Sequence, residues 1–219
     1  MAHASPRLYR LVVAGLETGC RLGELLSLQW REVNLKGREL CILASKAKDR
    51  EDRHIPISST LLAVLEMAQH GPTGQPLPSV AYVFGDECGS RIESPKKAWE
   101  TAVLKAHGHK PEWVRSRLSP ASRAAYRSTD LRFHDLRHEA GSRWLEAGWP
   151  LHQVKELLGH ETIATTDTYL NAGRIHLHES MLRLEAEGKV CTTFAQDSQS
   201  QPLPVLPAEH SGAPKSLVN

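Results

Sequence analysis

The stretch HDLRHEAGSRWLEAG, residues 134–148, gives the clearest entry to the fold and function of this sequence. Its pattern predicts a helix over residues 134–147. Spacings of three and four residues meet on a helix surface, so His134, Arg137 and His138 are expected to share one face. The trio fits a zinc pair, an anion-binding site or a solvated face, and the helix alone does not decide. An apolar series predicts that a neighbouring face packs on a core: Leu136, Ala140, Trp144, Leu145 and Ala147.

Length and composition indicate an ordinary globular chain. The 219 residues are 40% hydrophobic, enough for one large domain or two small ones. There is no apolar run long enough to span a membrane, and MAHASPRLYR lacks the order of a signal peptide. We therefore expect a cytoplasmic protein without a membrane partner. The cysteines are scattered and form no C-x-x-C, which predicts reduced thiols: Cys20, Cys41, Cys88 and Cys191.

Positive charge is concentrated in one segment. Residues 105–137 hold eight basic groups and three acids, a net charge of +5, although the whole chain carries only +2. Such concentration is typical of a phosphate-binding surface, because each neutralised phosphate releases condensed counterions. The alternative is a solvated arginine-rich loop. If the segment binds DNA, the expected contacts include four arginines: Arg115, Arg117, Arg123 and Arg127.

The pattern of elements predicts an α+β fold that is mainly helical, with a small antiparallel β-hairpin. The hairpin is expected over residues 38–58, with its tip carrying Lys46, Lys48, Arg50 and Arg53. A short strand is expected at YVFG, residues 82–85. Further helices are predicted over residues 6–19, 59–70, 94–107, 150–160, 162–173 and 174–188. A short helix is also predicted to start at Thr18 or just after it. The polar, proline-rich residues 189–219 are expected to be disordered.

The unusual polar residues are short of carboxylates, so the sequence favours phosphate chemistry without a metal. Metal-dependent nucleases need acidic ligands for magnesium, whereas the acids here, Glu24 and Asp135, lie beside arginines. Arginine offers a permanently charged, bidentate fork to the oxygens of a phosphodiester. A tyrosine such as Tyr169 is a reasonable nucleophile, and its phenolate leaves well enough for the bond to be resealed. No cofactor is expected.

Four motifs together resemble the catalytic domain of tyrosine recombinases, the phage integrase family. They are TGCRLGELLSLQW, HDLRH, LLGH and TDTYLNA, at residues 18–30, 134–138, 157–160 and 166–172. The resemblance covers about residues 6–187, and the motifs are specific as an ordered set. It implies a site-specific recombinase or integrase that breaks and rejoins double-stranded DNA through a 3′-phosphotyrosyl bond, and that self-associates on DNA as a tetrameric synapse. It also implies a bacterial or phage-type protein at the nucleoid.

The resemblance assigns a role to each matching residue. Arg21 and Arg137 would clamp the scissile phosphate, and Tyr169 would attack it. His160 would donate to a non-bridging oxygen, while His134 would assist proton movement at the nucleophile. In the hairpin, Lys48 would protonate the leaving oxygen, with Lys46 left open for that role, and Lys46 and Arg50 would also contact DNA. Glu24 would support the site, and we interpret His138 as structural or supporting.

Two features differ from the family pattern. Members normally carry an N-terminal helical domain that closes around DNA, whereas this chain begins close to the first catalytic helix. We therefore expect residues 1–188 to form the catalytic domain, with the N-terminal core-binding domain absent from this chain. The segment before FHDLRH is longer than in a minimal member, and it carries most of the excess positive charge.

Three other functions fit parts of the sequence. A zinc hydrolase would use His134 and His138 at i and i+4, but Arg137 would oppose the metal, and Asp135 is short for reaching a bound water. A DNA-binding module without catalysis would need only the basic segment, and it leaves Tyr169 unexplained. A type IB topoisomerase shares much of the chemistry, but the hairpin and the two histidine motifs resemble integrases more closely.

Overall fold

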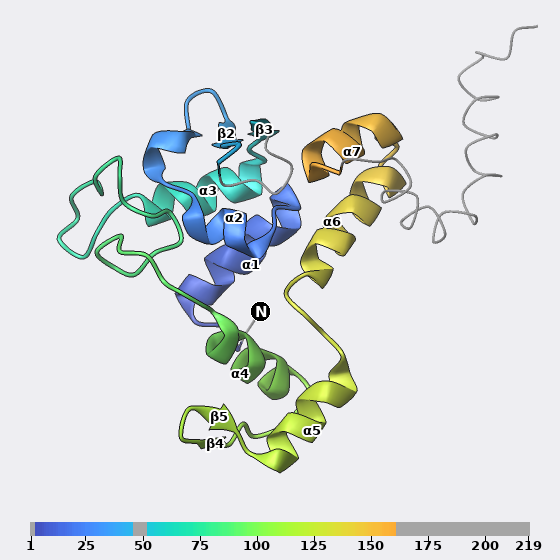
Figure 1. The fold of residues 1–219 in the computed structure, drawn as a ribbon. Helices are drawn as coiled ribbons and strands as arrows, with labels where there is room; N and C mark the ends of the chain where they lie inside the picture. Colours follow the sequence, from blue (N-terminus) through green and yellow to red (C-terminus); the bar gives the residue numbers. More distant parts are fainter. Residues whose placement is uncertain (1–2, 46–51, 161–219) are drawn as a thin grey trace, which may run out of the picture. The chain divides into compact units, whose positions relative to one another are not determined.

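Helix α1 (Pro6–Thr18) is the element around which the described fold is assembled (Figure 1). The computed structural model describes residues 3–45 and 52–160, all within one compact unit, Met1–Ile175. The Ser5 side chain caps the helix by accepting from the Leu8 amide, and Pro6 opens the first turn. Gly19 ends it in the left-handed conformation, with a φ of 59°. The predicted start and stop signals are thereby confirmed.

A three-stranded antiparallel sheet follows α2 (Leu22–Ser27) and the short 3₁₀ helix η1 (Trp30–Glu32). The strands β1 (Val33–Asn34), β2 (Glu39–Ile42) and β3 (Arg53–Pro56) pair in that order. Leu40 lies opposite Ile55, and Ile42 lies opposite Arg53. Leu40, Ile42 and Ile55 are buried in the main core, as alternation along the strands requires. The predicted hairpin is confirmed, and β1 adds a third strand.

Four helices complete the framework that positions the site. Helix α3 (Ser59–Ala68) and α6 (Asp135–Glu146) both pack against α1, and α7 (Leu151–Leu158) packs against α6. At the crossing of α1 and α6, a Cβ on Gly15 would lie 3.2 Å from Cδ1 of Leu136, so a small residue allows the close approach. Helix α4 (Lys96–Ala106) buries Trp99, whose ring meets that of Phe133 edge-on.

The strand predicted at YVFG is wrong. Tyr82 forms only an isolated bridge with Gln29, and the chain then turns, with the amide of Gly85 donating to the carbonyl of Tyr82. Val83 and Phe84 are buried because they pack into the main core. A short apolar run indicates burial equally well whether or not the backbone pairs as a strand.

The basic segment contains regular structure that the sequence analysis did not predict. Strands β4 (Trp113–Val114) and β5 (Arg117–Leu118) form a hairpin, and helix α5 (Pro120–Thr129) follows it. Arg115 and Ser116 make the turn with φ values of 46° and 65°. A turn of this kind usually carries Asn-Gly, so it gave no signal. The Ser119–Pro120 pair at the start of α5 was a signal that was available.

The structure also bears on two general expectations, which concern the thiols and membrane-spanning segments. Cys20, Cys41 and Cys88 are free thiols, and Cys191 lies outside the described residues. In the part of the chain that the structure describes, no helix is both long enough and apolar enough to cross a membrane.

Candidate functional site

Arg21 lies at the N-terminus of α2 and reaches across to the end of α7. Its backbone N–H donates to Oε2 of Glu24 at 2.8 Å, and its Nη1 donates to Oε1 of the same carboxylate at 3.0 Å. Its Nη2 donates to the carbonyl of Gly159 at 3.2 Å. The side chain keeps 25% of its surface exposed. Arg21 is therefore held from both sides while part of it faces solvent.

Arg137 is a buried cation held by backbone carbonyls. Only 2% of the residue is exposed. Its Nη1 donates to the carbonyl of Gly19 at 2.7 Å, and its Nη2 donates to that of Leu158. These carbonyls stand at the C-terminal ends of α1 and α7, where the helix dipole is negative, so the positions favour a cation. Two helix ends thus replace part of the hydration that burial removes.

Gly19 and Gly159 allow these helix ends to meet. Gly19 has a positive φ, and a Cβ there would lie 2.7 Å from Cδ2 of Leu158. Gly159 ends α7 with a φ of 62°, and the next amide, that of His160, donates to the carbonyl of Lys155. The turn therefore places the half-buried His160 directly after the carbonyls that hold the arginine pair, Arg21 and Arg137.

Glu24 joins Arg21 to a second arginine, Arg53. The carboxylate is 2% exposed, and its Oε2 accepts from Nη2 of Arg53 at 2.8 Å. The predicted place of Arg53 at the hairpin tip is wrong: it is the first residue of β3, and its side chain is 7% exposed. The R-x-x-P pattern ending at Pro56 was the signal that could have identified it. Lys46, Lys48 and Arg50 lie outside the described residues.

Cys20 lies against this ion-pair network and is chemically quiet. Its Sγ is 4.0 Å from Nη2 of Arg53. Burial raises the pKa of the Cys20 thiol, and the negative charge of Glu24 raises it further. The side chain therefore fills space beside the arginines as a neutral thiol.

The two histidines pair on the exposed side of α6, whereas Arg137 turns inward. The rings of His134 and His138 meet edge-on, with centroids 5.0 Å apart. The expectation of one shared face thus holds for the histidines but not for Arg137. Desolvation, followed by the charges of His138 and Arg137, lowers the pKa of His134 below its ordinary value. His134 is therefore neutral at pH 7 and able to accept a proton.

The described residues contain no metal centre of the kind that a zinc hydrolase needs. Within residues 3–45 and 52–160, no group of three or more His, Cys, Asp or Glu side chains could hold a metal ion. Arg137 also acts on His134 as a like charge, which would oppose a bound cation there.

The four arginines of the basic segment are not equivalent. Arg115 and Arg117 are exposed on the β4–β5 hairpin, and Arg127 is exposed on α5. We call these three the basic surface. Arg123 is half-buried, and its Nη1 lies 3.5 Å from Oε1 of Glu100, a side chain on α4 that is 3% exposed. Arg123 thus joins α5 to α4, while the basic surface faces solvent.

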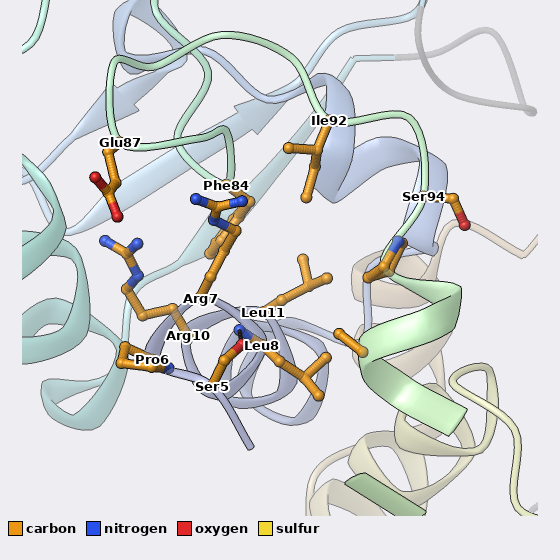
Figure 2. A pocket seen from close by; sticks show the side chains of 12 residues that line it. Ser5, Pro6, Arg7, Leu8, Arg10, Leu11, Phe84, Glu87, Ile92 and Ser94 are labelled. Atoms are coloured by element: carbon orange, nitrogen blue, oxygen red, sulfur yellow. Dashed lines mark hydrogen bonds between the residues drawn. The ribbon is translucent and has the colours of Figure 1, made fainter. Parts of the chain in front are cut away.

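A cavity of about 390 Å³ lies elsewhere, between the first turn of α1, the segment after Phe84 and the start of α4 (Figure 2). Arg7 and Arg10 reach toward it from α1, and burial and the charge of Arg7 lower the pKa of Arg10. None of the predicted site residues lines it. The candidate site is therefore the place where the ends of α1 and α7 meet α2 and α6, and Tyr169 lies outside the described residues.

Known proteins resemble this chain in sequence. The model of the phage integrase family matches residues 2–174. Among curated relatives, the tyrosine recombinase XerA of Pyrococcus horikoshii is 30% identical over 165 residues, which is 74% of this chain and 50% of that protein. The tyrosine recombinase XerD of Rhizobium meliloti is 31% identical over 178 residues, or 80% of this chain and 50% of the relative. The chain thus spans about half the length of these relatives.

Solved structures show the same fold. A crystal structure of XerA recombinase has a TM-score of 0.55 at 21% identity, over 85% of this chain and 59% of that one. The catalytic domain of bacteriophage HP1 integrase has a TM-score of 0.53 at 22% identity, over 82% of this chain and 86% of that one. With the fold, the ordered motifs and the family model in agreement, the chain belongs to the phage integrase family.

Proposed function

We propose that this chain carries the catalytic centre of a site-specific DNA recombinase. One observation carries the proposal: Arg21 and Arg137, from different helices, both bind carbonyls at the end of α7. Two guanidinium groups at one place suit a phosphodiester, whose non-bridging oxygens gain negative charge in the transition state. Membership of the phage integrase family and the names of the relatives, tyrosine recombinases, support the same function.

The proposed reaction exchanges one phosphoester for another. The phenol oxygen of Tyr169 attacks the phosphorus and loses its proton to the neutral His134. The bond from phosphorus to the 5′ oxygen breaks, and Lys48 protonates that oxygen as it leaves. The product is a 3′-phosphotyrosine and a free 5′-hydroxyl, and His160 donates to a non-bridging oxygen throughout. Attack by a 5′-hydroxyl reverses the steps, so rejoining needs neither ATP nor a metal.

Several further assignments belong to the same proposal. Residues 1–188 form the catalytic domain, and residues 189–219 form a tail outside it. The partner is double-stranded DNA, on which copies of the protein associate. The protein, of bacterial or phage type, acts in the cytoplasm at the nucleoid. Relatives include a bacterial recombinase, XerD of Rhizobium meliloti.

The test is covalent capture on a nicked DNA substrate that traps the first intermediate. We expect the wild-type protein to form an adduct that maps to Tyr169, and Tyr169→Phe to form none while binding DNA within about twofold of wild type. Tyr9→Phe is the matched control, because Tyr9 lies exposed on α1, and this variant should form the adduct normally.

Each other outcome contradicts part of the proposal. An adduct that survives in Tyr169→Phe contradicts the proposed nucleophile. DNA binding without any adduct in the wild type favours the binding module. Cleavage that vanishes in EDTA and returns with zinc favours the hydrolase.

The leaving-group acid is assigned by a second substrate. A 5′-bridging sulfur departs without protonation, so this substrate should rescue the alanine variant of the true acid. We expect rescue of Lys48→Ala. Rescue of Lys46→Ala alone would transfer the role to that residue.

A further inference from the structure

We infer that Arg53 is a positioning residue that fixes Arg21 through the buried carboxylate of Glu24. The inference rests on the proposed function and adds a residue that lies outside the predicted site. Nη2 of Arg53 is 2.8 Å from Oε2 of Glu24, and Nη1 of Arg21 is 3.0 Å from Oε1. One carboxylate therefore bridges two guanidinium groups, and each of its oxygens accepts from a different one of them.

Burial fixes one end of this bridge and leaves the other end partly facing solvent. Glu24 is 2% exposed and Arg53 is 7% exposed, whereas a quarter of the Arg21 side chain faces solvent. A buried carboxylate is stable only with close donors, and Oε2 accepts from Arg53 as well as from the backbone N–H of Arg21. Loss of Arg53 leaves Oε2 short of a charged donor. Glu24 then keeps only the donors of Arg21 itself, and it fixes the plane of that partly exposed guanidinium less firmly.

The position of Arg53 in the chain also connects the bridge to the hairpin. Arg53 is the first residue of β3 and pairs with Ile42 of β2. It follows the sequence KAKDRED, residues 46–52, which contains both candidate acids, Lys46 and Lys48. The carboxylate of Glu24 thus links the arginine that faces the phosphate to the strand that follows the lysines.

A structural ion pair and a positioning residue differ in what their loss changes. Removing a structural pair lowers stability and affects binding and cleavage together. Removing a positioning residue slows cleavage of bound DNA, because misdirected donors stabilise the transition state poorly. The effect should also depend on Arg21, since Arg53 acts only through it.

The first experiment measures adduct formation by the full chain on saturating nicked DNA, together with the DNA Kd and the melting temperature. Arg53→Lys should slow the adduct step about 10-fold, and Arg53→Met about 10²-fold, with Kd within about twofold of wild type. The double variant Arg21→Lys/Arg53→Lys should be no slower than Arg21→Lys alone, within about twofold. Arg31→Met is the matched control, because Arg31 is an exposed arginine 3.8 Å from Glu32.

A second experiment separates the two routes by which Arg53 could act. A methylphosphonate at the scissile position has no charge for Arg21 to bind, so the defects of the Arg21 and Arg53 variants should shrink together. A 5′-bridging sulfur removes the need for a general acid, and the defect of the Arg53 variants should remain on it.

Three outcomes overturn the inference. Rescue of Arg53→Lys by the sulfur substrate alone would place its effect on the lysine. Additive losses in the double variant would make Arg53 independent of Arg21. Parallel losses of melting temperature, Kd and rate would make it structural. Failure of the wild type to form an adduct at Tyr169 would instead remove the proposed function itself.

Discussion

The arginines at the end of α7 and those of the basic surface represent two ways to use the same side chain. Arg137 is 2% exposed and bonded to the carbonyls of two helix ends. Arg115, Arg117 and Arg127 are exposed. The first group is fixed in direction by buried partners. The second group supplies charge at the surface and is held less rigidly.

This difference suits the first group to the proposed catalysis and the second to the proposed binding of DNA. A group that stabilises a transition state must already point at the developing charge, because reorientation during the reaction costs the energy that it should supply. A group that holds DNA by its phosphates needs only to be near them, and it carries no sequence information. We therefore expect substitutions in the two regions to affect different measurements.

Substitution of the arginine pair should have the largest effect, which is on the rate of cleavage. Arg21→Lys and Arg137→Lys keep the charge but lose the bidentate fork, so each should slow adduct formation by roughly 10²-fold or more. Kd for DNA should stay within about twofold. Rapid-mixing assays on saturating nicked DNA measure the first quantity, and titration measures the second. Equal losses in both would remove the distinction between the regions.

The basic surface should control the salt dependence of binding. Replacing Arg115, Arg117 and Arg127 together by Ala should reduce the slope of log K against log salt by up to about 2.7, given roughly 0.9 per duplex phosphate contact. The loss should be similar on any DNA sequence. A control triple of exposed residues near the β1–β2 turn, Arg31, Lys36 and Arg38, should leave the slope unchanged. An unchanged slope in the variant that lacks Arg115, Arg117 and Arg127 would show that these arginines do not bind DNA.

Arg123 should act on stability instead. Arg123→Ala leaves the buried carboxylate of Glu100 without its cation, so urea unfolding should show a loss of about 1–2 kcal/mol. Arg127→Ala, four residues further on the same helix, should change the free energy of unfolding by less than about 0.5 kcal/mol. Adding Glu100→Gln to Arg123→Ala should restore part of the loss. A larger loss of stability in Arg127→Ala than in Arg123→Ala would contradict the different roles given to these two arginines.

The smallest effect concerns the protonation of His134. Its pKa is lowered, so His134 is neutral above its ordinary pKa, and any stability it contributes is lost as the pH falls through the lowered value. The adduct rate should fall over the same range, because a protonated ring cannot accept the phenol proton. NMR titration of the ring should give a pKa below the ordinary value. His138→Gln should raise it, since the charge of His138 is the second cause of the shift.

The sequence predicted those parts of the fold whose signals are local. Ser5 and Pro6 mark the start of α1, and Gly19 and Gly159 mark the ends of α1 and α7, because capping depends on a few neighbouring residues. Arg21 and Arg137 were identified from the order of the motifs. The structure adds distant partners for both, which are backbone carbonyls far away in the chain, while the predicted Glu24 binds Arg21 locally.

The features that were missed depend on distant contacts. Arg53, the first residue of β3, looks like the charged residues that precede it, and its burial follows from Glu24, 29 residues earlier. Val83 and Phe84 are apolar, which suggests a strand, but they are apolar because they pack into the main core. The β4–β5 turn carries Arg115 and Ser116 where glycine is usual. The R-x-x-P pattern singles out Arg53, but no local pattern names Glu24 as its partner.

The bonds of the arginine pair also have a consequence for how the protein is made. Arg21 binds a carbonyl 138 residues later, and Arg137 binds one 118 residues earlier. Contacts of such separation form late in folding, since a long loop must close before they contribute. A chain emerging from the ribosome carries the sequence of α1 and α2 long before that of α7. Partly synthesised chains therefore contain Arg21 without its carbonyl partner at the end of α7, and the proposed phosphate site arises only with the finished domain.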